Sequence, residues 1–216
     1  MAYFLHTFSP ETYEIFSRSD RKLSGFSKRW LHAAQRIRPG DKLICYLREL
    51  SRWVGVLEVL SDCFIDETPF FYSQNDPFVV RFEVRPVAWL PKEKAVPLRE
   101  DHVWNTLSYI RGHQKHSSTW AMWAARFRGG PSLLSEVEGK FLEDLIVSQL
   151  DGEHTYPVDE TEYRKNLRPR IRRGDGAVTV TIPTGADTEQ DIPKDDTLVR
   201  ESIIDHCTFI ETFCRV

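Results

Sequence analysis

Four strand-like runs in the first 90 residues constrain the fold of this chain most. Residues 2–8, 42–47, 53–60 and 78–90 are short stretches rich in aromatic and β-branched side chains, and turn residues separate them. In the longest run, apolar side chains alternate as far as the dipeptide Arg85-Pro86, which predicts a strand that is bent or bulged there. Because the strands are short and few helices separate them, the pattern indicates a small β-barrel.

Helical patterns flank these strands. Ser9 and Pro10 are typical of the N-cap and the first position of a helix, and Ser27 can cap a second one. Each expected helix has apolar side chains at helical spacing: 10–18, 28–37, 101–110 and 131–150. The predicted fold class is therefore α+β, a small β-barrel with flanking helices.

A domain boundary is predicted after residue 150. Residues 1–150 form the first domain, and residues 151–216 form a linker or extension with a terminal helix. From 151 to 194 the chain is polar and interrupted only by a strand-like run at 177–182. Residues 197–216 have the pattern of a strongly amphipathic helix, with more apolar surface than a free end should expose. Three explanations stay open: this helix docks on the first domain, forms a homodimer, or opens a further domain.

Composition narrows the class of protein. The chain has 216 residues, with 29 basic and 32 acidic side chains, as in ordinary globular proteins. No run of about 18 apolar residues occurs, so we expect no membrane span, and the first residues lack the pattern of a signal peptide. The four cysteines form no CxxC pair, which indicates reduced structural thiols. Together these features predict a cytoplasmic protein.

The charge is unevenly distributed along the chain. Residues 18–52 carry ten basic and three acidic side chains, and aromatic residues interrupt and border this segment. Such a segment suits a nucleic-acid surface, because Lys and Arg release phosphate counterions and rings stack on bases. The alternative is a solvated helix face without a ligand. Five side chains are candidates for contacts to a nucleic-acid backbone: Arg21, Lys22, Lys28, Arg29 and Arg52.

Motifs for catalysis or metal binding are weak. The run Glu138-Gly139-Lys140 has the Glu-x-Lys form of many nucleases, but it lies in an amphipathic helix pattern. His113 and His116 have no further ligands at zinc spacing. No nucleophile motif or phosphate-binding Gly loop occurs. We therefore predict a chain that is not an enzyme and needs no cofactor or metal.

The order and spacing of motifs over residues 2–150 resemble the EVE domain. The most specific parts are the turn Pro39-Gly40-Asp41, which leads into a strand ending in Tyr46, and the aromatic-x-Gly strand at Trp53. The other matching motifs are Ser24-Gly25-Phe26-Ser27, Asp66-Glu67-Thr68-Pro69-Phe70-Phe71 and the long strand 79–90. EVE domains belong with YTH and PUA domains to a superfamily of small, partly open β-barrels. The resemblance thus implies an α+β, PUA/YTH-like β-barrel with flanking helices.

This resemblance implies recognition of a modified base. Family members that have the pocket flip a methylated or hydroxymethylated base out of a nucleic acid and hold it between aromatic rings. For this chain the expected partner is DNA that carries 5-methylcytosine or 5-hydroxymethylcytosine, in antiviral restriction. RNA recognition, as in YTH and PUA relatives, and a non-catalytic protein-interaction module are the alternatives. Residues 198–213 resemble the first helix of certain restriction nuclease domains, which would place any nuclease activity in a domain or partner outside this chain.

The resemblance also suggests where the base would bind. The candidate pocket residues are Phe26, with Trp30 as its substitute, Trp53, Phe70, Phe71, and the polar Tyr46 and Ser27. Trp30, Tyr46 and Trp53 can also be explained as core residues. Phe70 and Phe71 would point in opposite directions on a strand, so only one of them should face a pocket. Phe26 is the hardest to explain as core, because Ser and Gly surround it and Lys22 and Lys28 flank the segment.

Overall fold

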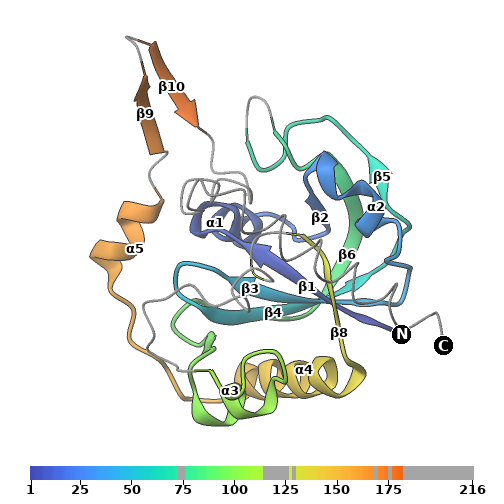
Figure 1. Ribbon diagram of the computed structural model, residues 1–216, viewed down its shortest axis with the longest axis vertical. Helices are drawn as coiled ribbons and strands as arrows, with labels where there is room; N and C mark the ends of the chain where they lie inside the picture. Colours follow the sequence, from blue (N-terminus) through green and yellow to red (C-terminus); the bar gives the residue numbers. More distant parts are fainter. Residues whose placement is uncertain (73–75, 114–126, 128–129, 168–169, 175–176, 182–216) are drawn as a thin grey trace, which may run out of the picture. The chain divides into compact units, whose positions relative to one another are not determined.

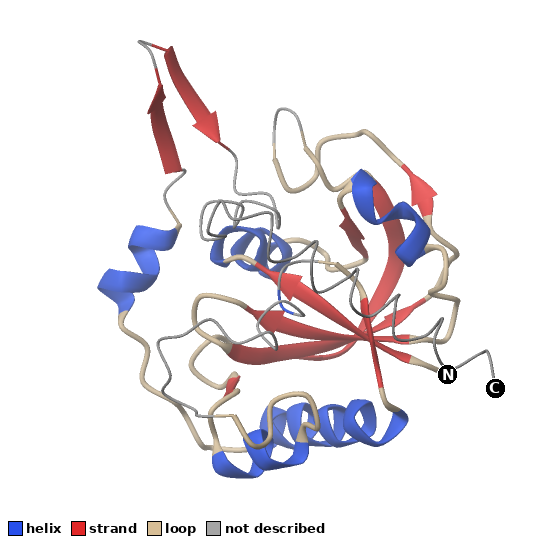
Figure 2. Cartoon of the chain, in the orientation of Figure 1, coloured by secondary structure: helices blue, strands red, loops and turns tan. Residues whose placement is uncertain are grey.

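The computed structural model describes residues 1–72, 76–113, 127, 130–167, 170–174 and 177–181, which belong to one compact unit (Figures 1 and 2). The predicted helix at 197–216, and with it the predicted dimer or nuclease contact, lies outside the described residues. Within the described part, no helix is long and apolar enough to cross a membrane.

A curled sheet of eight strands forms the centre of the described part (Figure 1). Six strands follow one another in the order β2-β6-β4-β3-β1-β8, while β5 pairs with β6 and β7 pairs with β4. The predicted α+β class with a curled sheet and flanking helices is confirmed. The strands are β1 Tyr3–Phe8, β2 Leu23–Phe26, β3 Lys42–Leu47, β4 Arg52–Val59, β5 Phe64–Ile65, β6 Val80–Trp89, β7 Val96–Pro97 and β8 Ser132–Leu134.

The pairing of β1 with β3 is parallel, whereas the other pairs of the sheet are antiparallel. A parallel pair needs a crossover connection. Here the crossover contains α1 (Pro10–Arg18), β2, the short 3-10 helix η1 (Lys28–Trp30) and α2 (Leu31–Ala34). The predicted start of α1 is confirmed: the Ser9 side chain accepts a hydrogen bond from the Thr12 N–H, and Thr12 Oγ1 accepts one from the Ser9 N–H.

The central strands are buried on both faces. On one face, Phe4, Phe8 and Leu43 pack with α1, and on the other, Leu5 and Ile44 pack with α4 (Glu136–Asp151). Figure 1 shows α1 on one side of the sheet, with α3 (Asp101–Thr106) and α4 on the other. Burial on both faces explains why the strands have nearly continuous hydrophobic sequences.

The predicted irregularity of the long strand is confirmed in β6. Leu57 of β4 pairs with Pro86, and the preceding residue, Val56, pairs with Ala88. Val87 is therefore an extra residue in the ladder, which is the geometry of a β-bulge. The bulge follows Pro86, which has no N–H to give to a ladder.

Three helix predictions were wrong in part. The expected helix 101–110 already ends at Thr106. The expected helix 28–37 is divided into η1 and α2, and the Ser27 side chain makes no capping hydrogen bond. The expected helix 131–150 begins only at Glu136, because Ser132–Leu134 form an edge strand on β1 and Ser135 is the N-cap. The apolar pair at 133–134 fits both periodicities, so the sequence pattern alone did not separate them.

The described part of the extension contacts the first 150 residues. The helix α5 (Glu160–Asn166) places Tyr163 in the core, where the side chain is 2% exposed and donates a hydrogen bond to Glu14 Oε1 at 3.0 Å. This helix was not predicted. The strand-like run at 177–182 corresponds to β10 (Ala177–Thr181), which pairs with β9 (Arg170–Gly174). The boundary after residue 150 stays a prediction.

Arg52 connects the extension to the sheet through hydrogen bonds. We therefore expect its substitution to lower the free energy of unfolding. Its guanidinium donates hydrogen bonds to the carbonyl oxygens of Lys92, Tyr156 and Pro157 at 2.8, 3.2 and 2.6 Å. Hydrogen bonds to charged groups are worth about 1.5–3 kcal/mol each, so Arg52→Gln should lower the free energy of unfolding by about 3 kcal/mol. Urea unfolding of this variant and of the exposed control Arg36→Gln measures the effect. A loss equal to that of the control would contradict the anchoring role.

Candidate functional site

Strand β2 carries the predicted Ser-Gly-Phe motif at an edge of the sheet. A Cβ atom at Gly25 would lie 2.6 Å from the Val80 carbonyl oxygen and 3.2 Å from Arg81 Cγ, so only glycine allows β2 to approach β6 this closely. The close approach buries Phe26, which is 1% exposed and packs edge-on against Phe82 with 6.1 Å between ring centroids. The expectation that Phe26 is the hardest of the candidate residues to explain as core was wrong, because it is a buried strand residue.

His6 of β1 lies beside Phe26, and sequence reasoning missed it. Its ring is tilted against the rings of Phe8 and Phe26, with centroid distances of 4.6 and 4.5 Å. Nε2 is 2.9 Å from Ser24 Oγ, while Nδ1 is buried and has no hydrogen-bond partner among the described residues. Burial lowers the pKa of His6 to about 3, so the imidazole is neutral at physiological pH. The alternation of β1 could have revealed it, because His6 occupies an inward position between two Phe residues.

The segment between β5 and β6 is fixed by Asp76 and carries Phe70 and Phe71. Asp76 Oδ2 accepts hydrogen bonds from the N–H groups of Phe70 and Phe71 at 2.9 and 2.7 Å, and Oδ1 accepts one from Phe78 N–H. The two rings pack edge-on, with centroids 4.7 Å apart. The prediction that they point in opposite directions was wrong, because they lie in a turn-rich segment and not on a strand. Phe71 is 5% exposed and Phe70 is half-buried.

Arg81 joins this segment to the edge of the sheet. Its guanidinium donates to Asp66 Oδ2 at 2.9 Å and to the carbonyl oxygen of Thr68, and it lies 3.6 Å from Asp76 Oδ2. Its side chain is 2% exposed, and its Cγ lies against Gly25. Arg81 therefore contacts both β2 and the Phe70-Phe71 segment. The sequence offered no clear sign of this role, because Arg81 alternates with apolar residues as a solvated strand residue would.

Trp53 and Tyr46 lie on the other face of the sheet. Trp53 is fully buried and packs edge-on against Tyr46 at 5.0 Å, and both rings contact Phe127. They belong to the core on the α4 side, whereas Phe26 belongs to the core on the α1 side. The described structure does not bring Trp53 and Tyr46 together with Phe26. The core interpretation accounts for the burial of both rings, while Trp53 Nε1 is buried without a hydrogen-bond partner among the described residues.

Trp30 and Ser27 lie directly after Phe26 in the chain. Trp30 is half-buried, and a Cβ atom at Gly130 would come within 2.7 Å of its ring, so the backbone there lies against the indole. The guanidinium carbon of Arg29 lies 5.0 Å from the Trp30 ring centroid. Ser27 is half-buried, and its carbonyl oxygen accepts a hydrogen bond from Trp30 N–H.

Exposed cations flank β2 on both sides. Lys22, whose side chain is 79% exposed, precedes the strand, and the exposed Lys28 and Arg29 follow it. Arg21 is half-buried and has a positive φ of 58°. The assignment of Arg52 to backbone binding was wrong, because its guanidinium is occupied by three carbonyl oxygens inside the protein.

The Glu138-x-Lys140 motif has a structural role in the described part. Glu138 accepts hydrogen bonds from Ser108 and from the helix cap Ser135, while Lys140 pairs with Asp144 at 2.7 Å. The described residues contain no cluster of three His, Cys, Asp or Glu side chains that could hold a metal ion.

Comparisons with known proteins give one sequence relative and several similar structures. No family model matches the chain. A UPF0310 protein of Pyrococcus abyssi is 27% identical over 127 residues, which cover 54% of this chain and 84% of that protein.

The similar solved structures include YTH domains. The Mmi1 YTH domain in complex with RNA has a TM-score of 0.46 at 15% identity, covering 69% of this chain and 79% of that one. The Pho92 YTH domain in complex with m6A has a TM-score of 0.48 at 13% identity, covering 72% and 87%. Rpa0253 of Rhodopseudomonas palustris has a TM-score of 0.43 at 14% identity, covering 71% and 98%.

The buried His6 predicts a specific loss of stability in acid. Its pKa is about 3 in the folded protein and 6.5 in an unfolded chain, so the unfolded state binds more protons between these pH values. Stability therefore falls as the pH drops below 6.5, by about 2 kcal/mol at pH 5 from this group. Urea unfolding at pH 7.5 and pH 5 should show this loss in the wild type and in the exposed control His32→Gln. His6→Gln should lack it, and an equal loss in all three proteins would show that His6 does not titrate this way.

Proposed function

We propose that this chain is a nucleic-acid-binding module that recognises a modified base. The proposed ligand is DNA with 5-methylcytosine or 5-hydroxymethylcytosine, and the proposed setting is restriction of foreign DNA. The proposed base site is formed by His6 of β1 and by Ser24 and Phe26 of β2, with Phe70 and Phe71 beside it. The protein binds and does not cleave.

The buried imidazole of His6 is the observation that carries this proposal. An unpaired polar atom in a core costs about 1–3 kcal/mol, so such atoms are rare in folded proteins. Here the imidazole contacts the rings of Phe8 and Phe26, and no described group forms a hydrogen bond with its Nδ1. A flat ligand with a polar edge can stack on a neighbouring ring and form the hydrogen bond that Nδ1 lacks.

Neutral His6 can either donate a hydrogen bond to a base edge or accept one from it. If Nε2–H donates to Ser24 Oγ, Nδ1 is an acceptor, and if Ser24 O–H donates to Nε2, Nδ1 carries the proton and is a donor. The hydroxyl of Ser24 can rotate, so one pair of residues serves donors such as a cytosine amino group and acceptors such as its ring nitrogen. Because the pKa of His6 is low, the imidazole is neutral at physiological pH, and both tautomers are accessible.

Entry of a base requires the Phe26 ring to leave its core position. Phe26 is the last residue of β2, and half-buried Ser27 follows it, so rotation of this side chain disturbs few backbone pairs. Stacking returns about 1–3 kcal/mol per base, against a cost of a few kcal/mol to unstack that base from DNA. A methyl group adds only about 0.8 kcal/mol, so polar contacts to the base edge must supply most of the discrimination.

The first test compares the pocket variant Phe26→Leu with Phe141→Leu, a matched change of a half-buried ring on α4. Fluorescence anisotropy is measured with matched duplexes that contain cytosine, 5-methylcytosine or 5-hydroxymethylcytosine, and with RNA containing N6-methyladenosine. Phe26→Leu should lose about tenfold or more in affinity for the modified duplex and little for the plain one, because only the stacking interaction is removed.

Thermal melts of both variants separate unfolding from loss of binding. Equal affinity of the wild type for all duplexes would contradict base recognition. Preference for the modified RNA would favour the alternative reader, and no nucleic-acid binding at all would favour a protein-interaction module.

The cations beside β2 generate a second prediction. Lys28→Gln should weaken binding to modified and plain DNA equally and lower the slope of log affinity against log salt by about 0.9, because one phosphate contact is lost. Lys140→Gln on α4 is the control, since Lys140 is exposed and pairs with Asp144. Anisotropy titrations at several salt concentrations measure both slopes. An unchanged slope for Lys28→Gln would remove this residue from the interface.

A further inference from the structure

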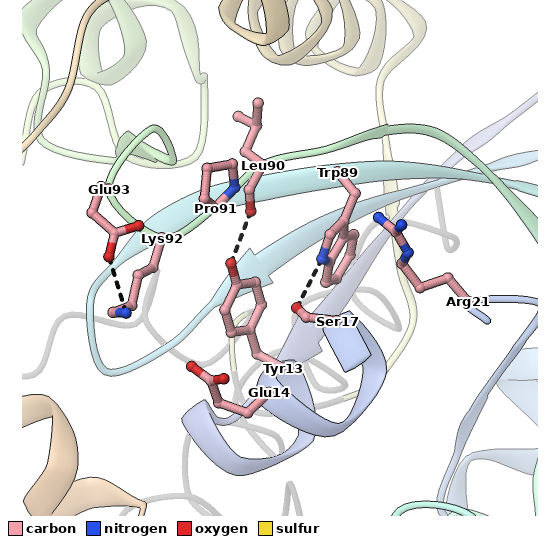
Figure 3. A pocket seen from close by; sticks show the side chains of 9 residues that line it. All are labelled: Tyr13, Glu14, Ser17, Arg21, Trp89, Leu90, Pro91, Lys92 and Glu93. Atoms are coloured by element: carbon pink, nitrogen blue, oxygen red, sulfur yellow. Dashed lines mark hydrogen bonds and ion pairs between the residues drawn. The ribbon is translucent and has the colours of Figure 1, made fainter. Parts of the chain in front are cut away.

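A second pocket lies between α1 and the end of β6 (Figure 3). Its volume is about 350 Å³, which is within the range of small-ligand sites. Nine residues from α1 and its following turn, and from residues 89–93, line it: Tyr13, Glu14, Ser17, Arg21, Trp89, Leu90, Pro91, Lys92 and Glu93. No sequence motif pointed to this site.

Two fixed aromatic rings form one wall of the pocket. Tyr13 and Trp89 are nearly parallel, with an interplanar angle of 23° and 5.5 Å between centroids. The Tyr13 hydroxyl donates to the Leu90 carbonyl oxygen at 2.8 Å, and Trp89 Nε1–H donates to Ser17 Oγ at 2.9 Å (Figure 3). Tyr13 is 4% exposed and Trp89 is half-buried, so the ring surface open to a ligand comes mainly from Trp89, which Tyr13 supports from the side.

Two cations, Lys92 and Arg21, line the pocket, and within the described part of the chain only Lys92 forms ion pairs. Arg21 is therefore available to an anionic ligand. Lys92 pairs with Glu93 at 3.0 Å and with Glu160 at 3.1 Å, and Glu14 accepts a hydrogen bond from Tyr163. Arg21, in contrast, forms no ion pair within the described part of the chain. Figure 3 shows its guanidinium beside Trp89, at the edge of the pocket. A flat group with an attached anion fits this combination of rings and cation.

A chain of ring contacts connects this pocket with the proposed base site. Trp89 packs edge-on against Phe8 at 5.4 Å, Phe8 contacts His6 at 4.6 Å, and His6 contacts Phe26 at 4.5 Å. Three successive ring contacts therefore connect Trp89 with Phe26. Arg21 and β2 are also close in sequence, since Lys22 alone separates them.

We propose that this pocket binds a second nucleotide of the same strand, with its base against the Trp89 ring and its phosphate on Arg21. This inference rests on the proposed function. It predicts that the protein reads a modified base together with a neighbouring nucleotide.

The experiment uses a short DNA duplex with one 5-hydroxymethylcytosine and with 2-aminopurine, a fluorescent adenine analogue, at a neighbouring position of the same strand. Stacking on an aromatic side chain quenches 2-aminopurine. The full chain should quench the probe, and Arg21→Gln and the pocket-filling variant Ser17→Phe should each lose this quenching and bind at least fivefold more weakly. Arg18→Gln is the matched control, because its side chain is 80% exposed on the same helix and does not line the pocket.

The outcomes separate this inference from the proposed function. In Arg21→Gln the ratio of affinities for modified and plain duplexes should stay as in the wild type, because the first site is untouched. If the wild type discriminates between these duplexes but Arg21→Gln binds and quenches like Arg18→Gln, the second-nucleotide pocket is wrong and the reader function stands. If the wild type binds no oligonucleotide, both are wrong. Arg21→Gln keeps the test valid if Ser17→Phe fails to fold.

Discussion

The contact between Gly55 and Trp89 supports both sites described above. These residues are direct partners on β4 and β6, and a Cβ atom at Gly55 would lie 2.4 Å from Trp89 Cε3. Only glycine lets the indole lie across the neighbouring strand. From this position Trp89 contacts Phe8 and also Phe16 of α1, at 5.4 and 4.7 Å. The same ring thus holds α1 on the sheet, forms a wall of the second pocket and supports the rings beside His6.

The two-sided burial of the sheet decides which aromatic residues can act together. Successive residues of a strand point to opposite faces, so Phe26 packs on the α1 side while Trp53 packs on the α4 side. The Ser-Gly-Phe motif of Phe26 and the aromatic-x-Gly motif of Trp53 lie near each other in the sequence, although their rings pack on opposite faces of the sheet. A pocket that joined both would need an opening through the central strands, which the backbone pairing of β3, β4 and β1 prevents. The aromatic residues therefore divide into two independent groups.

Much of the fold could be predicted from local patterns. The strands β1, β3, β4 and β6, the start of α1 and the bulge near Pro86 follow from alternation, capping and the missing proline N–H, whereas the short strands β2, β5, β7 and β8 were not predicted. The details of the candidate site could not be predicted, because they depend on contacts between distant segments. Gly25 and Arg81 are 56 residues apart, and only their contact shows that Phe26 is drawn into the core. Arg52 was similarly misread, since a basic residue in a basic segment gives no sign of distant carbonyl partners.

A buried polar group is therefore a better guide to function here than the number of rings. The chain contains 13 Phe, 7 Tyr and 6 Trp, and the predicted pocket rings of Phe26, Tyr46, Trp53 and Phe71 are all buried in the core, so a ring alone does not mark a ligand site. A phenylalanine at position 6 would suit the neighbouring rings of Phe8 and Phe26 without an unpaired nitrogen or a penalty in acid. Histidine at position 6 lowers the free energy of unfolding, and packing against the neighbouring rings does not offset this loss. The hydrogen bond that Nδ1 can offer to a ligand is the compensation that the proposed function supplies.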